Sequence, residues 1–485
     1  MTTQKNAAPD TPKVSKAPDG QPFIVAMLGA YDLPSLGYTT AEYFCTGTAN
    51  SYTLSGPQTP DGYWQASPDQ GRPYTTRIVT ALPDANKFNG TIVVEWLNVT
   101  GGMDTPVDWW TMHRELIRGG YAWIGVSAQS VGIEGGAAAI PNAAVPPPLK
   151  QLDPARYDGL NHPGDAFSYD IFSQIGHFLH GLDAEQVLGA LAPKRIIAVG
   201  ESQSAVFLTT YVNAVAPLGK AYDGYLIHSR FGCSARMDGA PLLGATDNMP
   251  QNVLLRTDLT VPVIVVCTET DVLGARLPGT RDARQPDTEF LRSWEITGTA
   301  HADNYLANVA SIDSGAATIE ALASGLTPTA NFAGMELAEP MNFCPAQHYV
   351  VQAALRHLDT WIAKGTAPAT AVPIELASDP TEAALDAFGN AKGGIRTPWL
   401  DVPTAQLRGT GTVSASPAAS LVGVGRPFSA AKLNQLYPGG QAEYLAKFSV
   451  ALSSSIDAGF LLADDRDEIL ALAATAYAQA PSSHS

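Results

Sequence analysis

The chain is poor in the features that define several large classes of protein. Four cysteines in 485 residues cannot build a dense disulfide framework, and their separations do not match metal-ligand spacing, so we expect free buried thiols. No stretch approaches the roughly 18 consecutive apolar residues of a transmembrane helix. The first twenty residues also lack the apolar run of a secretory signal. The cysteines are Cys45, Cys233, Cys267 and Cys344.

Basic residues are scarce as well. The chain has 29 Lys and Arg against 46 Asp and Glu, a formal net charge of −17. A field of this sign repels nucleic-acid phosphates and anionic membrane surfaces, so neither is an expected partner. Charged residues make up only 15% of the chain and hydrophobic residues 45%, enough for a large core. We expect a cytoplasmic protein, or a secreted one if an export signal has been removed.

Two regions are predicted from composition and pattern. Residues 1–20 mix Lys, Pro, Ala and Asp without periodicity, which is typical of a flexible N-terminal tail. No linker divides the remainder, so residues 21–485 are interpreted as a single elaborated domain. Its first part, residues 38–82, contains segments rich in Thr, Tyr and β-branched residues and broken by Gly, Pro and Asp, which predict antiparallel strands.

Buried strands and helices then alternate along the chain. Short apolar, β-branched runs are typical of strands covered on both faces, and the stretches between them have helical spacing. This order predicts an α/β fold built on a doubly wound, mostly parallel sheet with an antiparallel N-terminal edge. The expected strands are residues 91–97, 122–127, 195–199, 225–228, 261–267 and 293–297.

Several segments do not fit the alternation. Three are predicted to be insertions that shape a pocket, because ligands bind beyond the carboxyl ends of strands where such loops gather. They lie near residues 132–148, 231–259 and 304–346. Residues 366–485 are predicted to be a C-terminal extension, irregular at first and helical at its end.

The most informative segment runs from Arg195 to Phe207 and contains Gly200-Glu-Ser202-Gln-Ser204. A buried strand followed by this turn and then a helix is the context of a nucleophile elbow. Ser204 stands where the usual pattern has glycine, so the match to G-x-S-x-G is imperfect. We interpret Ser202 as a nucleophile; the alternative is a serine that only caps the following helix.

A serine nucleophile needs a base and a group that orients the base. His301 follows an expected strand and is predicted to be the base, since an unperturbed pKa of about 6.5 suits proton transfer in both directions. Asp271, just past the strand at residues 261–267, is predicted to be the acid, with Glu269 as the alternative. His348 is the second choice for the base because it opens a helix.

Backbone N–H groups should stabilise the oxyanion formed by the attack. One donor is expected from Gln203, at a helix N-terminus. The second is expected from the turn after the early strand, where we favour Val99 and keep Thr100 as the alternative.

Two further groups of residues are candidates for ligand binding. His177 and His180 lie one helical turn apart without a nearby third ligand, so we predict no metal site and no cofactor. Four arginines after the predicted acid could attract an acidic substrate, or form a solvated loop that balances local carboxylates. These are Arg276, Arg281, Arg284 and Arg292.

These residues resemble the α/β-hydrolase superfamily, and more narrowly a sparsely characterised group of large bacterial α/β-hydrolase-domain proteins. Segments such as TIVVEWLNVTGG, AVGESQSA, VVCTETDV and WEITGTAHAD carry the resemblance. It implies a Ser202–His301–Asp271 triad. The chain departs from the superfamily at Ser204 and at Leu97-Asn98, where a His-Gly pair is usual. Some similar proteins carry export signals.

Residues and resemblance together predict a serine carboxylesterase. The substrate is expected to be a small-molecule carboxylic ester or a lactone, cleaved through an acyl-enzyme. One alternative keeps the triad but acts as an amidase, acyltransferase or C–C hydrolase; another is a non-catalytic ligand-binding protein of the same fold. The sequence neither favours nor excludes a homodimer.

Overall fold

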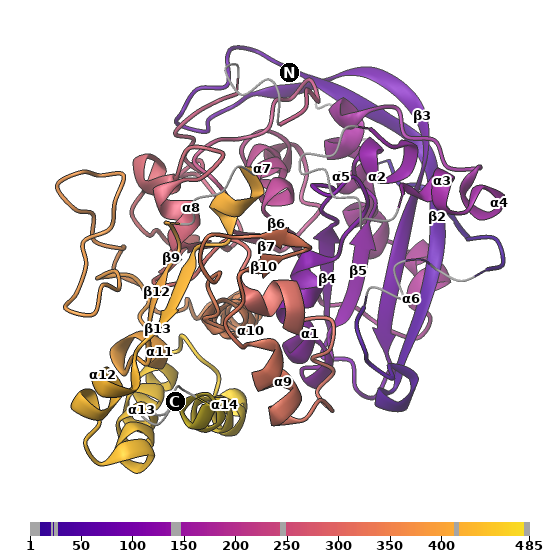
Figure 1. The fold of residues 1–485 in the computed structure, drawn as a ribbon. Coiled ribbons are helices and arrows are strands. Elements are labelled where there is room, and N and C mark those ends of the chain that lie inside the picture. The colour runs from indigo at the N-terminus through magenta and orange to yellow at the C-terminus, as the bar shows by residue number, and fades with distance from the viewer. Residues whose placement is uncertain are drawn as a thin grey trace.

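A single nine-stranded sheet organises the fold of the computed structural model, which describes residues 10–20, 23, 28–136, 147–242, 249–411 and 417–479. The strand order is β1-β2-β3-β5-β4-β6-β7-β8-β9. Strands β4 to β9 run parallel to one another, and β1, β2 and β3 form the antiparallel edge (Figure 1). The bounds are β1 (Lys13–Lys16), β2 (Tyr38–Leu54), β3 (Ala66–Pro83), β4 (Thr91–Trp96), β5 (Ala122–Val126), β6 (Arg195–Glu201), β7 (Gly224–His228), β8 (Val263–Thr268) and β9 (Leu291–Ile296).

Helices cover both faces of the parallel part. Alternate residues of β4 enter two separate cores: Ile92 and Val94 pack with α5 (Ser168–His180) and α7 (Gln203–Thr210) on one side. Val93 packs on the other side with α1 (Val107–Arg118) and α10 (Ala346–Lys364). All six residues of β4 are therefore buried. The predicted doubly wound, mostly parallel sheet with an antiparallel N-terminal edge is confirmed.

The remaining elements are short or lie outside the sheet. Two small antiparallel pairs join β10 (Asn331–Phe332) to β11 (Met335–Glu336) and β12 (Ala405–Arg408) to β13 (Val424–Pro427). Among the described residues, no helix combines the length and apolar character needed to span a bilayer. The other helices are α2 (Ser130–Glu134), α3 (Leu149–Leu152), α4 (Pro154–Tyr157), α6 (Glu185–Leu188), α8 (Glu269–Leu273), α9 (Ile319–Gly325), α11 (Pro398–Asp401), α12 (Ala430–Leu436), α13 (Gly440–Asp457) and α14 (Arg466–Gln479).

The prediction of a flexible tail over residues 1–20 is wrong for part of that segment. Lys13–Lys16 forms β1, which pairs with β2 through partners such as Val14 and Cys45. Val14 is buried while its neighbours are exposed, so one apolar side chain and a ladder of backbone hydrogen bonds hold the strand. A single apolar residue among charged ones was too weak a pattern to predict it. Residues 1–9 lie outside the described part.

The C-terminal extension packs on the main domain. Phe448 of α13 and Ile469 of α14 belong to the same core as Trp109 of α1. Figure 1 shows α12, α13 and α14 grouped next to α11, on the far side of the molecule from β2 and β3. Of the predicted insertions, residues 304–346 hold α9, β10 and β11, whereas residues 137–146 and 243–248 of the other two lie outside the description.

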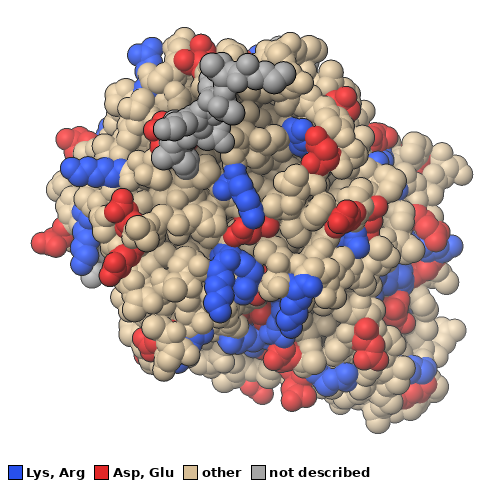
Figure 2. Space-filling view, turned by 180° about the vertical axis from the view of Figure 1, so that it is seen from behind, with Lys and Arg blue, Asp and Glu red and all other residues tan. Residues whose placement is uncertain are grey.

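The surface and the cysteines agree with the composition. Figure 2 shows Lys and Arg side chains interspersed with Asp and Glu on the face opposite to that of Figure 1. All four cysteines are free and buried. Burial raises the pKa of the Cys45 and Cys344 thiols to about 12, so neither is a nucleophile near neutral pH.

Candidate active site

Ser202 occupies a sharp turn between β6 and α7. Its backbone has φ 56° and ψ −116°, which is unusual for a residue with a side chain and stores strain. A Cβ atom at Gly200 would lie 3.1 Å from the backbone of Ser204, so a larger residue at position 200 would require β6 and α7 to move apart by a few tenths of an ångström. Ser204 is fully buried at this contact, which explains a small residue there.

The structure brings Ser202, His301 and Asp271 together. Ser202 Oγ lies 2.8 Å from His301 Nε2, and His301 Nδ1 lies 2.6 Å from Asp271 Oδ1. The three side chains follow three different strands, β6, β9 and β8, at the same edge of the sheet. His301 is 5% exposed and Asp271 is fully buried, so water competes little for these hydrogen bonds.

Local geometry of α8 decides which acid faces the imidazole. Thr268 caps the helix, and the Oδ2 atom of Asp271 accepts from the Thr268 amide at 2.7 Å and from its hydroxyl at 2.8 Å. This capping box holds the carboxylate with Oδ1 toward His301. Glu269 instead accepts from the amides of Gly298 and Gly409, each at 3.0 Å, and pairs with Arg408. The alternative acid is therefore turned away from the imidazole.

The two candidate oxyanion loops face each other beside Ser202. The Thr100 hydroxyl donates to Gln203 Oε1 at 3.1 Å, which joins the turn after β4 to the start of α7. The Thr100 amide is occupied, because it donates to Asn98 Oδ1 at 2.7 Å. Within the described chain no acceptor faces the amides of Val99 and Gln203. Of the two candidates on the β4 side, only Val99 keeps a free N–H.

The pocket above Ser202 is small and mostly apolar. Its volume is about 40 Å³. Leu421, from the C-terminal extension, and Leu242, from a predicted insertion, both line it. The Phe231 ring lies 5.1 Å from the His301 ring, centroid to centroid. The remaining lining residues are Thr100, Ser202, Gln203, Arg276 and Leu277.

Sequence reasoning missed Glu201, the residue before Ser202. Its Oε1 atom lies 3.6 Å from His301 Nε2, and Oε2 accepts from Asn98 Nδ2 at 3.1 Å. Burial raises the pKa of Glu201 well above its ordinary value, and the nearby Asp108 and Asp271 carboxylates raise it further. The sequence feature that could have identified Glu201 is its position as an acidic residue between the glycine and the serine of the elbow.

Other histidines lie elsewhere. His228 is fully buried and bonds Asp108 at 2.9 Å through Nδ1 and Gln347 at 3.1 Å through Nε2. His348, the second choice for the base, bonds the Thr111 carbonyl and stacks on Tyr305, so the structure does not place it with Ser202.

The two histidines of α5 and most of the four arginines are not near Ser202. His177 and His180 lie at the end of α5, and within the described ranges no three potential ligands gather into a metal site. Arg281, Arg284 and Arg292 bond carbonyls or carboxylates of their own region, whereas Arg276 lines the Ser202 pocket. Arg281, Arg284 and Arg292 each lie within 4 Å of a nearby carboxylate, as the charge-balancing interpretation expects: Asp282 at 3.7 Å, Glu295 at 2.7 Å and Asp287 at 3.9 Å. All three are partly exposed rather than fully solvated.

The raised pKa of Glu201 predicts a pH-dependent effect of Glu201→Gln. The native state holds the proton above the unfolded pKa of about 4.3, so the native stability falls as pH rises toward the folded pKa. Glutamine does not titrate. The variant should therefore unfold at a higher temperature than the parent at pH 8, with a smaller difference at pH 5, measured by calorimetry.

The exposed Glu289 supplies the matched control, because Glu289→Gln should shift the unfolding temperature little at either pH. An equal shift at pH 5 and pH 8 for Glu201→Gln would contradict the raised pKa.

Comparisons with known proteins agree with the fold. The chain matches a family model described as an alpha/beta hydrolase domain over residues 7–471, and therefore belongs to that family. A comparison with curated proteins found no match.

Solved structures show only a distant likeness. An esterase from Pyrococcus furiosus is 9% identical with a TM-score of 0.29, covering 59% of this chain and 88% of its own. Acetyl xylan esterase 1 from Thermoanaerobacterium sp. is 9% identical with a TM-score of 0.26, covering 51% and 80%. A thermostable esterase from Pseudomonas putida is 10% identical with a TM-score of 0.27, covering 52% and 74%. Family membership rests on the family model and not on these scores.

Proposed function

We propose that the protein is a serine hydrolase that cleaves small carboxylic esters, lactones among them, through an acyl-enzyme. The observation that carries the proposal is the hydrogen-bonded series from Ser202 through His301 to Asp271, with separations of 2.8 and 2.6 Å. A serine on a strained turn, a base within reach of its hydroxyl and a buried acid behind the base are the parts that nucleophilic catalysis requires.

In the proposed reaction, Ser202 Oγ attacks the ester carbonyl carbon while His301 Nε2 takes the hydroxyl proton. The tetrahedral intermediate collapses, its C–O bond breaks, and His301 gives the proton to the leaving alcohol. Water then repeats the sequence on the acyl-enzyme and releases a carboxylic acid. Asp271 accepts from His301 Nδ1, which fixes the tautomer and stabilises the imidazolium.

The amides of Gln203 and Val99 are the proposed oxyanion donors. Both keep an N–H without an acceptor in the described chain, and Gln203 stands at the N-terminus of α7, where the helix dipole favours an anion. The apolar side chains of Phe231, Leu242 and Leu421 support an apolar acyl group in the pocket.

Labelling with a fluorophosphonate tests the nucleophile. Only an activated serine reacts, so we expect one phosphonyl group per chain on the peptide that contains Ser202. His301→Gln should slow labelling by on the order of 100-fold or more, because the serine loses its base. Labelling at another serine, or equal rates in the two proteins, would remove the proposal.

The type of bond is tested by product analysis. An esterase should partition its acyl-enzyme mainly to water, so that added methanol or glycerol changes the products little at low concentration. Dominant transfer to the added alcohol would instead establish the acyltransferase alternative on the same three residues.

A further inference from the structure

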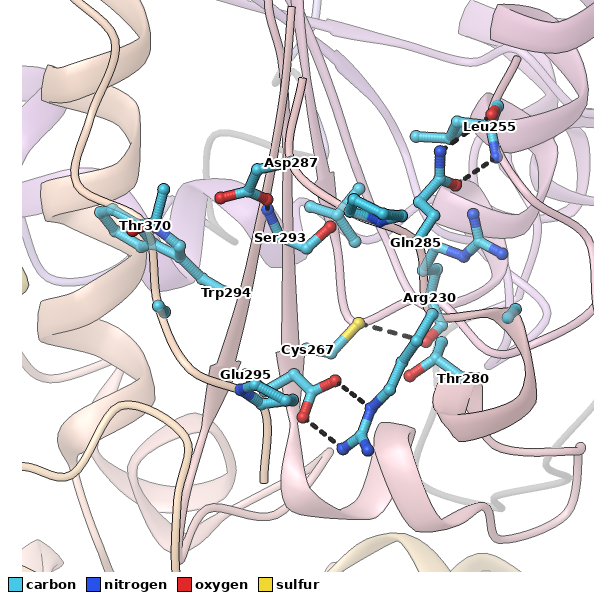
Figure 3. A pocket seen from close by; sticks show the side chains of 16 residues that line it. Arg230, Leu255, Cys267, Thr280, Gln285, Asp287, Ser293, Trp294, Glu295 and Thr370 are labelled. Carbon is cyan, nitrogen blue, oxygen red and sulfur yellow. Dashed lines mark hydrogen bonds and ion pairs between the residues drawn. The ribbon is translucent and has the colours of Figure 1, made fainter. Parts of the chain in front are cut away.

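A second and larger cavity lies apart from Ser202. Its volume is about 500 Å³, and residues of β8, β9, the 280–287 segment and the 370–373 segment line it. Figure 3 shows Arg230, Gln285 and Leu255 on the right of this cavity and Trp294 and Thr370 on the left. A cavity of this size accommodates a small organic molecule.

Arg230 gives the cavity its chemical character. The residue is only 3% exposed, yet none of its bonds goes to a carboxylate. Its Nε donates to the Phe231 carbonyl at 3.1 Å and its Nη2 to the Val253 carbonyl. Its Nη1 has no acceptor in the described part of the chain. A guanidinium remains charged in proteins, so a buried positive charge stands here with unused donors.

The other buried arginines of the chain are neutralised. Arg77, fully buried, pairs with Glu42 at 3.0 Å and Asp104 at 2.7 Å, and Arg156 also pairs with Glu42. A buried charge without a partner costs several kcal/mol. Arg230 therefore differs from Arg77 and Arg156, because it is buried without a carboxylate partner.

The charged neighbours in the cavity wall are already paired. Glu295 bonds Arg284 through both carboxylate oxygens, each at 2.7 Å. Asp287 accepts from the Ser293 amide at 2.9 Å and lies 3.9 Å from Arg292. The Gln285 amide group is used by the Leu255 backbone. Arg230 is thus left as the group in the wall that lacks an anion.

We propose that this cavity binds a small organic carboxylate, with its anionic head on the Arg230 guanidinium. Guanidinium and carboxylate are matched in geometry and charge. The apolar walls, which include Leu255, Val265 and Trp294, would hold the hydrocarbon body of the ligand. The ligand class is therefore an amphiphilic monocarboxylate such as a substituted benzoate.

The cavity and the Ser202 pocket are neighbours that share no lining residue among those described. Phe231, whose carbonyl accepts from Arg230, places its ring 5.1 Å from that of His301. Thr280, in the cavity wall, donates to the Asp271 carbonyl at 3.4 Å. A carboxylate bound to Arg230 would therefore lie next to Phe231, the residue whose ring packs against the His301 imidazole.

Calorimetric titration with 4-bromobenzoate tests the site. We expect saturable binding that weakens about tenfold or more in Arg230→Gln, with the neutral 4-bromobenzamide binding at least tenfold more weakly than the acid. Arg426→Gln, which changes an exposed ion pair in the same way, should bind as the parent does. Equal affinity in Arg230→Gln, or no saturable binding, would overturn the proposal.

A crystal soaked in 4-bromobenzoate locates the ligand independently of any esterase activity. The anomalous signal of bromine should lie in the 500 Å³ cavity, and a signal only beside Ser202 would overturn the proposal while leaving the proposed function intact. Thr370→Trp is a second variant that tests the same cavity if Arg230→Gln fails to fold. Because Thr370 is exposed and lines the cavity, a tryptophan there should abolish binding without disturbing the core.

Discussion

Ser202→Ala is expected to lower kcat for p-nitrophenyl acetate by on the order of 10⁵-fold or more, with the fold unchanged. The reason is that the acyl-enzyme cannot form without the hydroxyl that lies 2.8 Å from His301. A residual rate above the uncatalysed reaction should remain, because oxyanion donors and substrate binding still act. Initial rates of the parent and of the variant at saturating substrate measure the effect, and circular dichroism checks that the variant keeps the fold.

Ser204→Ala is the matched control for this experiment. Ser204 stands two residues away on the same turn, and its buried hydroxyl has no hydrogen-bond partner in the described chain. Removing that hydroxyl should leave kcat within a few-fold of the parent. Full activity in Ser202→Ala, or an equal loss in both variants, would rule out Ser202 as the nucleophile.

Asp271→Asn is expected to lower kcat by about 10⁴-fold, with little change in KM. An amide at this position can no longer stabilise the imidazolium, and it can present N–H to His301 Nδ1, which would force the wrong tautomer. The loss should therefore fall on the chemical step. Steady-state kinetics with p-nitrophenyl acetate separates kcat from KM.

Glu269→Gln should behave in the opposite way. Glu269 is fully buried and holds Arg408 and two backbone amides, so its change should lower the free energy of unfolding by about 1–3 kcal/mol. Its effect on kcat should be small, since it does not touch His301. A loss of activity in Glu269→Gln as large as that in Asp271→Asn would reverse the assignment of the acid.

The turn at Ser202 is predictable from the sequence because the small residues that it requires lie within two positions of Ser202. Gly200 and Ser204 must be small for β6 and α7 to approach, and both residues stand in the same short segment. Which of Asp271 and Glu269 orients His301 could not be predicted from the neighbouring sequence. It depends on Thr268 as a helix cap and on Gly409, which lies about 140 positions further along the chain.

The sequence did not predict that the C-terminal extension supplies residues to the candidate active site. Gly409 accepts a hydrogen bond from Thr270 Oγ1, and a Cβ atom on it would come within 2.5 Å of the Thr270 amide. Leu421 reaches the Ser202 pocket. An irregular Pro- and Gly-rich segment has no periodicity that predicts where its residues pack, so only the folded chain brings it to the site.

The sequence by itself determined the doubly wound sheet and the turn that carries Ser202, because hydrophobic periodicity and small residues act over short distances along the chain. The tertiary structure alone decided which carboxylate faces His301 and that Glu201 lies next to the same imidazole. It also decided that Arg230 lies buried in a cavity wall with no carboxylate paired to it. These arrangements arise from contacts between residues distant in sequence, and they depend on packing and charge balance that no local pattern records.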